Sequence, residues 1–114
     1  MAGTPKQISP TAYLGTAAAN IYAPPASTIY SLIRQIHLCN VGTVVATFTL
    51  CNSLSTGVET AGTELFYLQP ILPGSPIEWC CYLPMKSTNF LVGHSPTGTV
   101  NVTITVLGDQ MVVP

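Results

Sequence analysis

One stretch, residues 28–50, constrains the fold of this chain more than any other, because its second half alternates strictly. Val44, Ala46, Phe48 and Leu50 point to one side of an extended chain, and the residues between them point to the other. A period of two that is rich in β-branched residues indicates a strand half-buried in a sheet. The joint at 40–43, Asn-Val-Gly-Thr, suits a tight reversal because Asn and Gly tolerate positive φ. We therefore expect a long β-hairpin over 28–50, at the centre of an all-β domain.

The first half of this stretch, Thr28–Asn40, is compatible with a strand or with a helix, because its apolar residues also recur at helical spacing. Its content of Ile, Tyr, Thr and Cys, in place of Ala, Glu and Lys, favours the strand. Leu32, Ile36 and Leu38 then share one face, and Arg34 falls on that same face. We therefore expect a bulge or an edge position near Arg34 and Gln35.

The rest of the chain is divided by its Gly and Pro residues into short alternating segments typical of strands. The segments 64–72 and 77–83 flank a Pro-Gly turn, so we expect them to form a second hairpin, with Pro70 at an edge or a break. The segment 99–107 is the clearest strand, and its valines and Ile104, from Val100 onward, should face inward. The expected fold is an antiparallel β-sandwich or jelly roll of seven to eight strands over 20–114, preceded by an extended N-terminal arm over 1–19.

Charge is the most informative part of the composition. Only 6% of the residues are charged, against about 25% in an ordinary soluble domain. A surface of Thr, Ser, Asn and apolar residues is suited to burial in an oligomer or a larger assembly. The alternative is a neutral, Thr-rich surface that stays solvated. The net charge of −1 and the lack of a basic patch argue against nucleic acid as a partner.

Other features of the sequence bear on where the chain resides. No apolar run approaches the length of a membrane span, so no membrane partner is expected. The first ten residues, MAGTPKQISP, lack the apolar core of a signal peptide, which favours synthesis in a cytoplasm. The four cysteines, Cys39, Cys51, Cys80 and Cys81, should then stay reduced and act as small apolar residues. A metal site built from His37, Cys39 and Cys51 is the alternative, and it lacks a clustered ligand motif.

No catalytic constellation or cofactor motif is present in the sequence, so we expect neither an enzyme nor a bound cofactor. The adjacent pair His94-Ser95 does not place a base on a nucleophile, since adjacency alone gives no such geometry. Trp79, with Phe66, Tyr67 and Tyr82, has two possible uses. These aromatics either form a sugar-binding platform or pack within the core or between subunits, and their place in alternating segments favours packing.

Several segments together resemble small virion proteins of tailed bacteriophages. The clearest are 20–27, NIYAPPAS, and 33–40, IRQIHLCN, followed by 65–75, LFYLQPILPGS, then the aromatic 78–82, EWCCY, and the closing 100–108, VNVTITVLG. The resemblance covers nearly the whole chain. It implies a β-sandwich or jelly-roll subunit that decorates the capsid shell or belongs to the head–tail or tail structure. It brings no catalytic residues with it.

The favoured hypothesis is therefore a structural virion protein, a capsid decoration protein that forms a homotrimer and binds the major capsid protein of the phage. It would be made in the cytoplasm of the host bacterium and reside in the virion. The alternative is a tail-associated or host-surface module that binds carbohydrate through Trp79, Tyr67 or His94. The residues expected at contacts between subunits are Arg34, His37, Tyr67 and Trp79.

Overall fold

A computed structural model describes residues 6–25 and 28–112, and these residues form eight β-strands joined by turns and loops. The described residues include no helix of the length and apolarity needed to cross a membrane. The strands are β1 (Lys6–Tyr13), β2 (Ala19–Tyr22), β3 (Thr28–Asn40), β4 (Ala46–Ser53), β5 (Glu64–Ile71), β6 (Pro76–Met85), β7 (Phe90–His94) and β8 (Val102–Val112).

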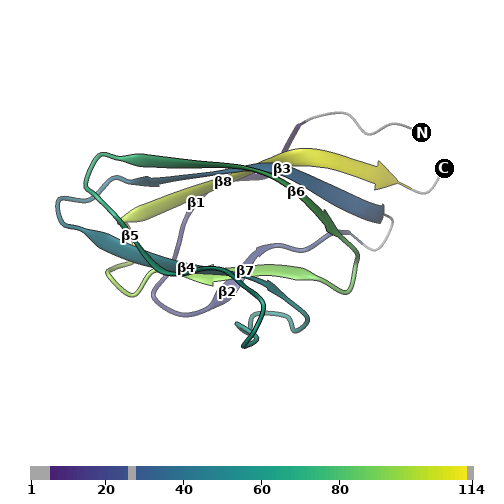
Figure 1. Cartoon of the computed structure of the whole chain (residues 1–114), viewed down its shortest axis with the longest axis horizontal. Helices are drawn as coiled ribbons and strands as arrows, with labels where there is room; N and C mark the ends of the chain where they lie inside the picture. The colour runs from purple at the N-terminus through teal and green to yellow at the C-terminus, as the bar shows by residue number, and fades with distance from the viewer. Residues whose placement is uncertain (1–5, 26–27, 113–114) are drawn as a thin grey trace.

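The strands form two four-stranded antiparallel sheets that lie face to face (Figure 1). Sheet A has the order β1-β8-β3-β6, and sheet B has the order β2-β7-β4-β5. The pairs β1–β8, β2–β7, β3–β6 and β4–β5 are all antiparallel. These are the pairs that arise when one long antiparallel ribbon is rolled up, so the fold is a jelly roll. The prediction of an all-β sandwich is confirmed, and the topology selects the jelly roll.

The two predicted hairpins are wrong. β3 and β4 lie in different sheets, and so do β5 and β6. The link between β3 and β4 therefore crosses from one sheet to the other. Among the described residues, Leu68 alone of the non-glycine residues has positive φ, and Gly42 does not have it either, so the link is no tight hairpin turn. Alternation identifies the buried face of a strand, but it carries no information about which strand is its neighbour.

The strand character of β3 is confirmed over its whole length, and it pairs with both β6 and β8. Both ladders shift register between Ile33 and Gln35, so the bulge expected at Arg34 is present, at a central strand and not at an edge. The bulge changes which residues face inward. Ile33, Ile36 and Leu38 belong to the core, whereas Leu32, predicted to share their face, lies on the outer face.

Gly108 permits this irregularity. A Cβ at Gly108 would lie 2.1 Å from the carbonyl oxygen of Leu32 and 3.1 Å from the Cα of Ile33. No side chain fits at those distances, so β8 approaches β3 closely only because residue 108 is glycine. β8 runs without a break from Val102 to Val112, and the extra residue at this register shift, Arg34, lies in β3.

The core lies between the sheets and follows the predicted alternation in β4 and β8. Ala46, Phe48 and Leu50 are fully buried, and Val102, Ile104 and Val106 are buried opposite them. Val100 was expected to join this row but is 63% exposed, because the strand begins two residues later, at Val102. The expected alternation of β6 is confirmed, with Ile77, Trp79, Cys81 and Leu83 packed against the core.

The chain before residue 20 contributes to the sandwich. From Lys6 to Tyr13 it forms β1, the edge strand of sheet A beside β8. Leu14, just after β1, is fully buried in the core. Within the described residues, the arm expected over 1–19 is thus largely part of the domain. The first five residues lie outside the described part of the chain.

Asn40 fixes the corner where the chain leaves sheet A. Its side chain is completely buried, and its Nδ2 donates to the carbonyl oxygens of Val44 (2.8 Å) and Ile71 (2.9 Å). Its Oδ1 accepts from the backbone N–H of Gly42 at 2.9 Å. One amide thereby holds both the link from β3 to β4 and the end of β5. A buried amide with all of these partners is stabilising, whereas an unpaired one would be costly.

Candidate interaction surfaces

The four residues predicted to make contacts between subunits are not brought together. Arg34 and His37 lie on the outer face of sheet A, Tyr67 lies on β5 at the edge of sheet B, and Trp79 packs against the core between the sheets. They therefore do not form one patch.

Arg34 sits at the bulge of β3 and contacts β8. Its Nε donates to Oδ2 of Asp109 at 2.7 Å, and the side chains of Arg34 and Asp109 are 53% and 12% exposed. The hydrogen bond to Asp109 and the charge of that carboxylate raise the pKa of the Arg34 guanidinium. The other oxygen of Asp109, Oδ1, is buried without a hydrogen-bond partner among the described residues. Arg34 thus makes an inter-strand contact that compensates a largely buried carboxylate.

His37 also makes an inter-strand contact. Its Nδ1 lies 3.4 Å from Oε1 of Glu78, its partner in the register of β3 and β6. The side chains are 36% and 62% exposed. An ion pair this open to solvent contributes little to stability.

Tyr67 projects from an irregular segment of β5. The ladder between β4 and β5 shifts register between Phe48 and Leu50, opposite Tyr67 and Leu68. Leu68 has φ +47°, in the left-handed region that is unfavourable for a residue with a side chain. Its N–H donates to the hydroxyl of Thr49 at 3.1 Å, and Tyr67 is 70% exposed. The edge position predicted from Pro70 is confirmed, but no pattern in the sequence marks the bulge.

Trp79 belongs to an aromatic cluster that closes one side of the sandwich. Its ring lies edge-on to Phe66 at a centroid distance of 5.2 Å, and Phe66 lies 5.2 Å from Phe48. The cluster joins β6 of sheet A to β5 and β4 of sheet B. Such arrangements stabilise aromatic pairs beyond their burial alone. Trp79 therefore has the packing role, as its place in an alternating strand indicated, and it forms no platform with the exposed Tyr67.

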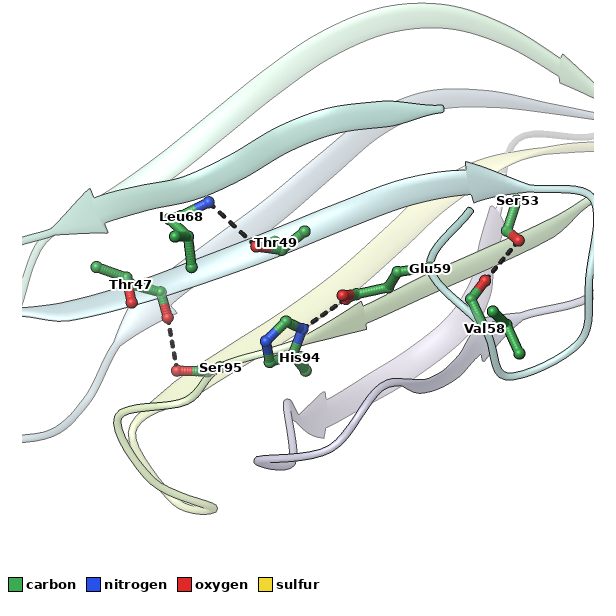
Figure 2. A network of polar contacts seen from close by, with 8 residues as sticks. All are labelled: Thr47, Thr49, Ser53, Val58, Glu59, Leu68, His94 and Ser95. Carbon is green, nitrogen blue, oxygen red and sulfur yellow. Dashed lines mark hydrogen bonds and ion pairs between the residues drawn. The ribbon is translucent and has the colours of Figure 1, made fainter. Parts of the chain in front are cut away.

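The chain's own loop, residues 54–63, folds back over part of the outer face of sheet B, where Glu59 reaches His94 (Figure 2). Glu59 reaches from this loop to His94 of β7, with Oε2 2.5 Å from Nδ1. At the base of the loop, the Ser53 hydroxyl donates to the carbonyl oxygen of Val58 at 2.5 Å. On β2, the Asn20 side chain accepts from the N–H of Gly57 at 2.7 Å. The loop is therefore tied to β4, β7 and β2 at once.

This cover buries side chains that point away from the core. Thr49, Cys51 and Ser53 alternate with the inward residues of β4, yet they are at most 2% exposed. Burial raises the pKa of the Cys51 thiol, and the nearby Glu59 carboxylate raises it further. Nothing in the sequence showed that the segment 54–63 folds back over a sheet.

The outer face of sheet A is different, because it contains an open groove. The groove has a volume of about 380 Å³ and lies at the end of the sheet where β6 finishes. Its walls come from β3, β6 and the turn that follows β6, and its lining residues are Tyr30, Leu32, Tyr82, Pro84, Lys86 and Asn89. Leu32 is buried, whereas Tyr82 is 75% exposed. Sequence reasoning missed this site, since Leu32 was assigned to the opposite face.

The remaining reactive side chains have structural contacts. The Ser95 hydroxyl is buried and donates to the carbonyl oxygen of Thr47 at 2.8 Å, while the adjacent His94 faces Glu59. The four cysteines are free thiols. The ligands of the alternative metal site are separated, because His37 and Cys39 lie in sheet A and Cys51 in sheet B. Within the described ranges, no three His, Cys, Asp or Glu side chains gather to hold a metal ion.

Comparisons with known proteins add little to this description. No model of a known protein family matches the chain, and no curated protein matches it. A solved structure similar to it is a chain of the cyanophage Pam1 capsid asymmetric unit, with 12% sequence identity. The match covers 96% of this chain and 86% of that chain, with a TM-score of 0.45. The fold assignment rests on the strand pairing alone.

Proposed function

We propose that this protein is a structural component of a tailed-phage virion, specifically a capsid decoration protein that binds the outside of the major capsid shell and stabilises it. It acts without catalysis or a cofactor, as a homotrimer. It is made in the cytoplasm of the host bacterium and incorporated into the particle. The jelly roll supports this proposal because it is a common architecture of viral capsid domains, although it also occurs in lectins.

The observation that carries the proposal is the neutral, partly apolar surface. Each of the four carboxylates contacts a partner in its own chain: Asp109 contacts Arg34, Glu78 contacts His37, Glu59 contacts His94, and Glu64 accepts from the N–H of Gly62. Large apolar side chains are exposed on both sheets and on the loops, among them Tyr13, Val44, Leu54, Tyr67, Leu72 and Tyr82. Such a surface suits permanent association with neighbours.

The alternative, a carbohydrate-binding module on the tail, draws less support from the geometry. Its three candidate residues lie apart, since Trp79 packs against the core, Tyr67 is on the edge of sheet B and His94 is paired with Glu59. A sugar platform needs an accessible aromatic face beside polar groups. If a Trp79→Ala variant lost glycan binding while it kept its fold, the tail module would replace the capsid proposal.

Two measurements test the proposed function. Sedimentation of the purified protein should give the mass of a trimer. Mixing with capsids of the virus that encodes it, from which the protein has been removed, should give saturable binding and raise the temperature at which the shells break open. A monomer that does not bind the shells would contradict the proposal.

A further inference from the structure

The groove on sheet A combines an apolar floor with basic surroundings. Leu32 forms part of the floor, and the rings of Tyr30 and Tyr82 stand beside it. Lys86 lines the groove and is exposed, and no ion pair involves it among the described residues. An apolar cavity of this size with a few polar groups around it is typical of a binding site for a side chain or a small ligand.

The strand register brings basic residues from distant parts of the sequence to this end of sheet A. Asp109 is opposite Leu32 on β3, and Leu32 is opposite Pro84 on β6, two residues before Lys86. Arg34 contacts Asp109, and Ile33, the residue before it, is opposite Leu83, which follows Tyr82 on β6. Arg34 and Lys86, two of the three basic residues of the chain, therefore lie at this end of the sheet.

The acidic residues are distributed differently. Among the described side chains, Asp109 is the one carboxylate at this end, and it is engaged by Arg34. Glu78 is opposite His37, farther along sheet A, and Glu59 and Glu64 belong to the loop and strand of sheet B. The groove is therefore the basic end of a chain with little charge elsewhere, and it attracts an acidic group. The described contacts of Arg34 use its Nε–H, which leaves its other donors available to a partner.

We infer that this groove is the docking site for the capsid shell, and that its occupant is a segment of the shell protein carrying a carboxylate beside an apolar side chain. A second copy of this chain is a poorer occupant, because each of its four carboxylates is already engaged within its own chain. Nucleic acid is a poorer occupant as well, because two cations, one of them paired with Asp109, do not form a phosphate-binding track. This inference rests on the proposed function.

The experiment uses a matched pair of tyrosines. Tyr82 is 75% exposed on the edge strand of sheet A, and Tyr67 is 70% exposed on the edge strand of sheet B. Neither side chain is needed for the core, so Tyr82→Ala and Tyr67→Ala should both fold, with unfolding temperatures near that of the wild type. Binding of each variant to stripped shells is measured by cosedimentation over a range of protein concentrations.

Tyr82→Ala should weaken shell binding at least about tenfold, as expected for an aromatic anchor, whereas Tyr67→Ala should bind like the wild type. Lys86→Glu should weaken binding more than Lys86→Met, and binding of the wild type should fall as salt is added. Equal binding of Tyr82→Ala, Lys86→Glu and the wild type would overturn the inference and leave the proposed function intact. Failure of the wild type itself to bind would overturn both. Dissociation of the free oligomer by Tyr82→Ala would show that the groove holds a second copy, which also overturns the inference.

Discussion

The outer faces of the two sheets are used in opposite ways. On sheet B, the outward residues Cys51 and Ser53 of β4 are buried next to the loop 54–63, and both are 0% exposed. On sheet A, the outward residues of β6 are open, including Cys80 and the highly exposed Tyr82. The strand count is the same in both sheets, so the difference lies in what the connecting loops do.

The difference indicates which face is available to a partner. A covered face is already packed, and a partner would first have to displace the loop and its hydrogen bonds. The open face of sheet A needs no such rearrangement, and it contains both the apolar groove and the basic residues. Preformed sites of this kind avoid the entropic cost of ordering on binding. The chain therefore covers part of one sheet with its own loop and leaves the outer face of the other sheet open.

The largest effect should come from substituting a glycine in each sheet. Gly108→Ala places a Cβ 2.1 Å from the Leu32 carbonyl oxygen in sheet A, and Gly93→Ala places one 2.8 Å from the Thr49 carbonyl oxygen in sheet B. We expect the free energy of unfolding in urea to fall by about 3 kcal/mol or more for Gly108→Ala, and by about 1–2 kcal/mol for Gly93→Ala. Gly15→Ala, with its nearest atom 4.0 Å away, serves as the control and should change stability by less than about 0.5 kcal/mol. Equal effects at 108 and 15 would contradict the close approach of β8 to β3.

A smaller loss is expected at the corner between the sheets. Asn40→Ala leaves the N–H of Gly42 and the carbonyl oxygens of Val44 and Ile71 without the partner they have now. Chemical unfolding should show a loss of about 2 kcal/mol, since buried groups become unsatisfied. Asn89→Ala, in an exposed turn where the side chain accepts the Lys86 N–H, should cost much less. If both substitutions had the same effect, Asn40 would not be the residue that holds the corner.

Removing the contact between Glu59 of the loop and His94 of sheet B should expose the part of sheet B beneath the loop. Glu59→Ala deletes the contact with His94, and we expect a loss of about 1 kcal/mol in the stability of the closed loop. This corresponds to an increase of about fivefold in the rate at which Cys51 is alkylated. Glu64→Ala also removes a carboxylate that raises the pKa of the Cys51 thiol, but it leaves the contact between Glu59 and His94 in place, and it should increase the rate much less. A Cys51 rate that does not respond to Glu59→Ala would mean that other contacts hold the loop.

The smallest effect concerns the strained bulge at the edge of sheet B. Leu68→Gly relieves the positive φ of residue 68, and the gain should roughly offset the lost contacts of a side chain that is 43% exposed. The thermal midpoint should therefore stay constant or rise slightly. Leu72→Gly, at an exposed residue with ordinary φ, should lower it. A clear loss of stability with Leu68→Gly would show that the leucine side chain outweighs the strain.

Local patterns predicted the strands well, because alternation reports directly on burial. Val102, Ile104 and Val106 are buried as expected. The charged residue Arg34, which interrupts the alternation of apolar residues in β3, correctly predicted the bulge there. The same patterns failed where the answer depends on distant partners. Val100 continues the alternation but lies in a turn. The segment Asn-Val-Gly-Thr at 40–43 resembles a hairpin turn, although the chain crosses from one sheet to the other there.

The candidate sites were harder to predict for the same reason. Lys86 and Leu32 meet at one groove only because β3 pairs with β6, and no short-range signal specifies this pairing. The cover on sheet B depends on Glu59 meeting His94, 35 residues away. The exposed Tyr67 and the packed Trp79 both lie in alternating segments, so the sequence did not show that they have different roles.

Two cysteines that point outward on opposite sheets allow the most direct test. Cys80 is exposed on sheet A, and Cys51 is buried beneath the loop on sheet B, where burial also raises its pKa and so lowers its thiolate fraction. In the free protein, alkylation mapped by mass spectrometry should modify Cys80 rapidly and Cys51 slowly. Once the protein is bound to capsid shells, Cys80 should be protected and Cys51 should react at its former rate. Unchanged labelling of Cys80 on the shell, or equal rates for the two thiols in the free protein, would contradict the assignment of sheet A as the face left open for assembly.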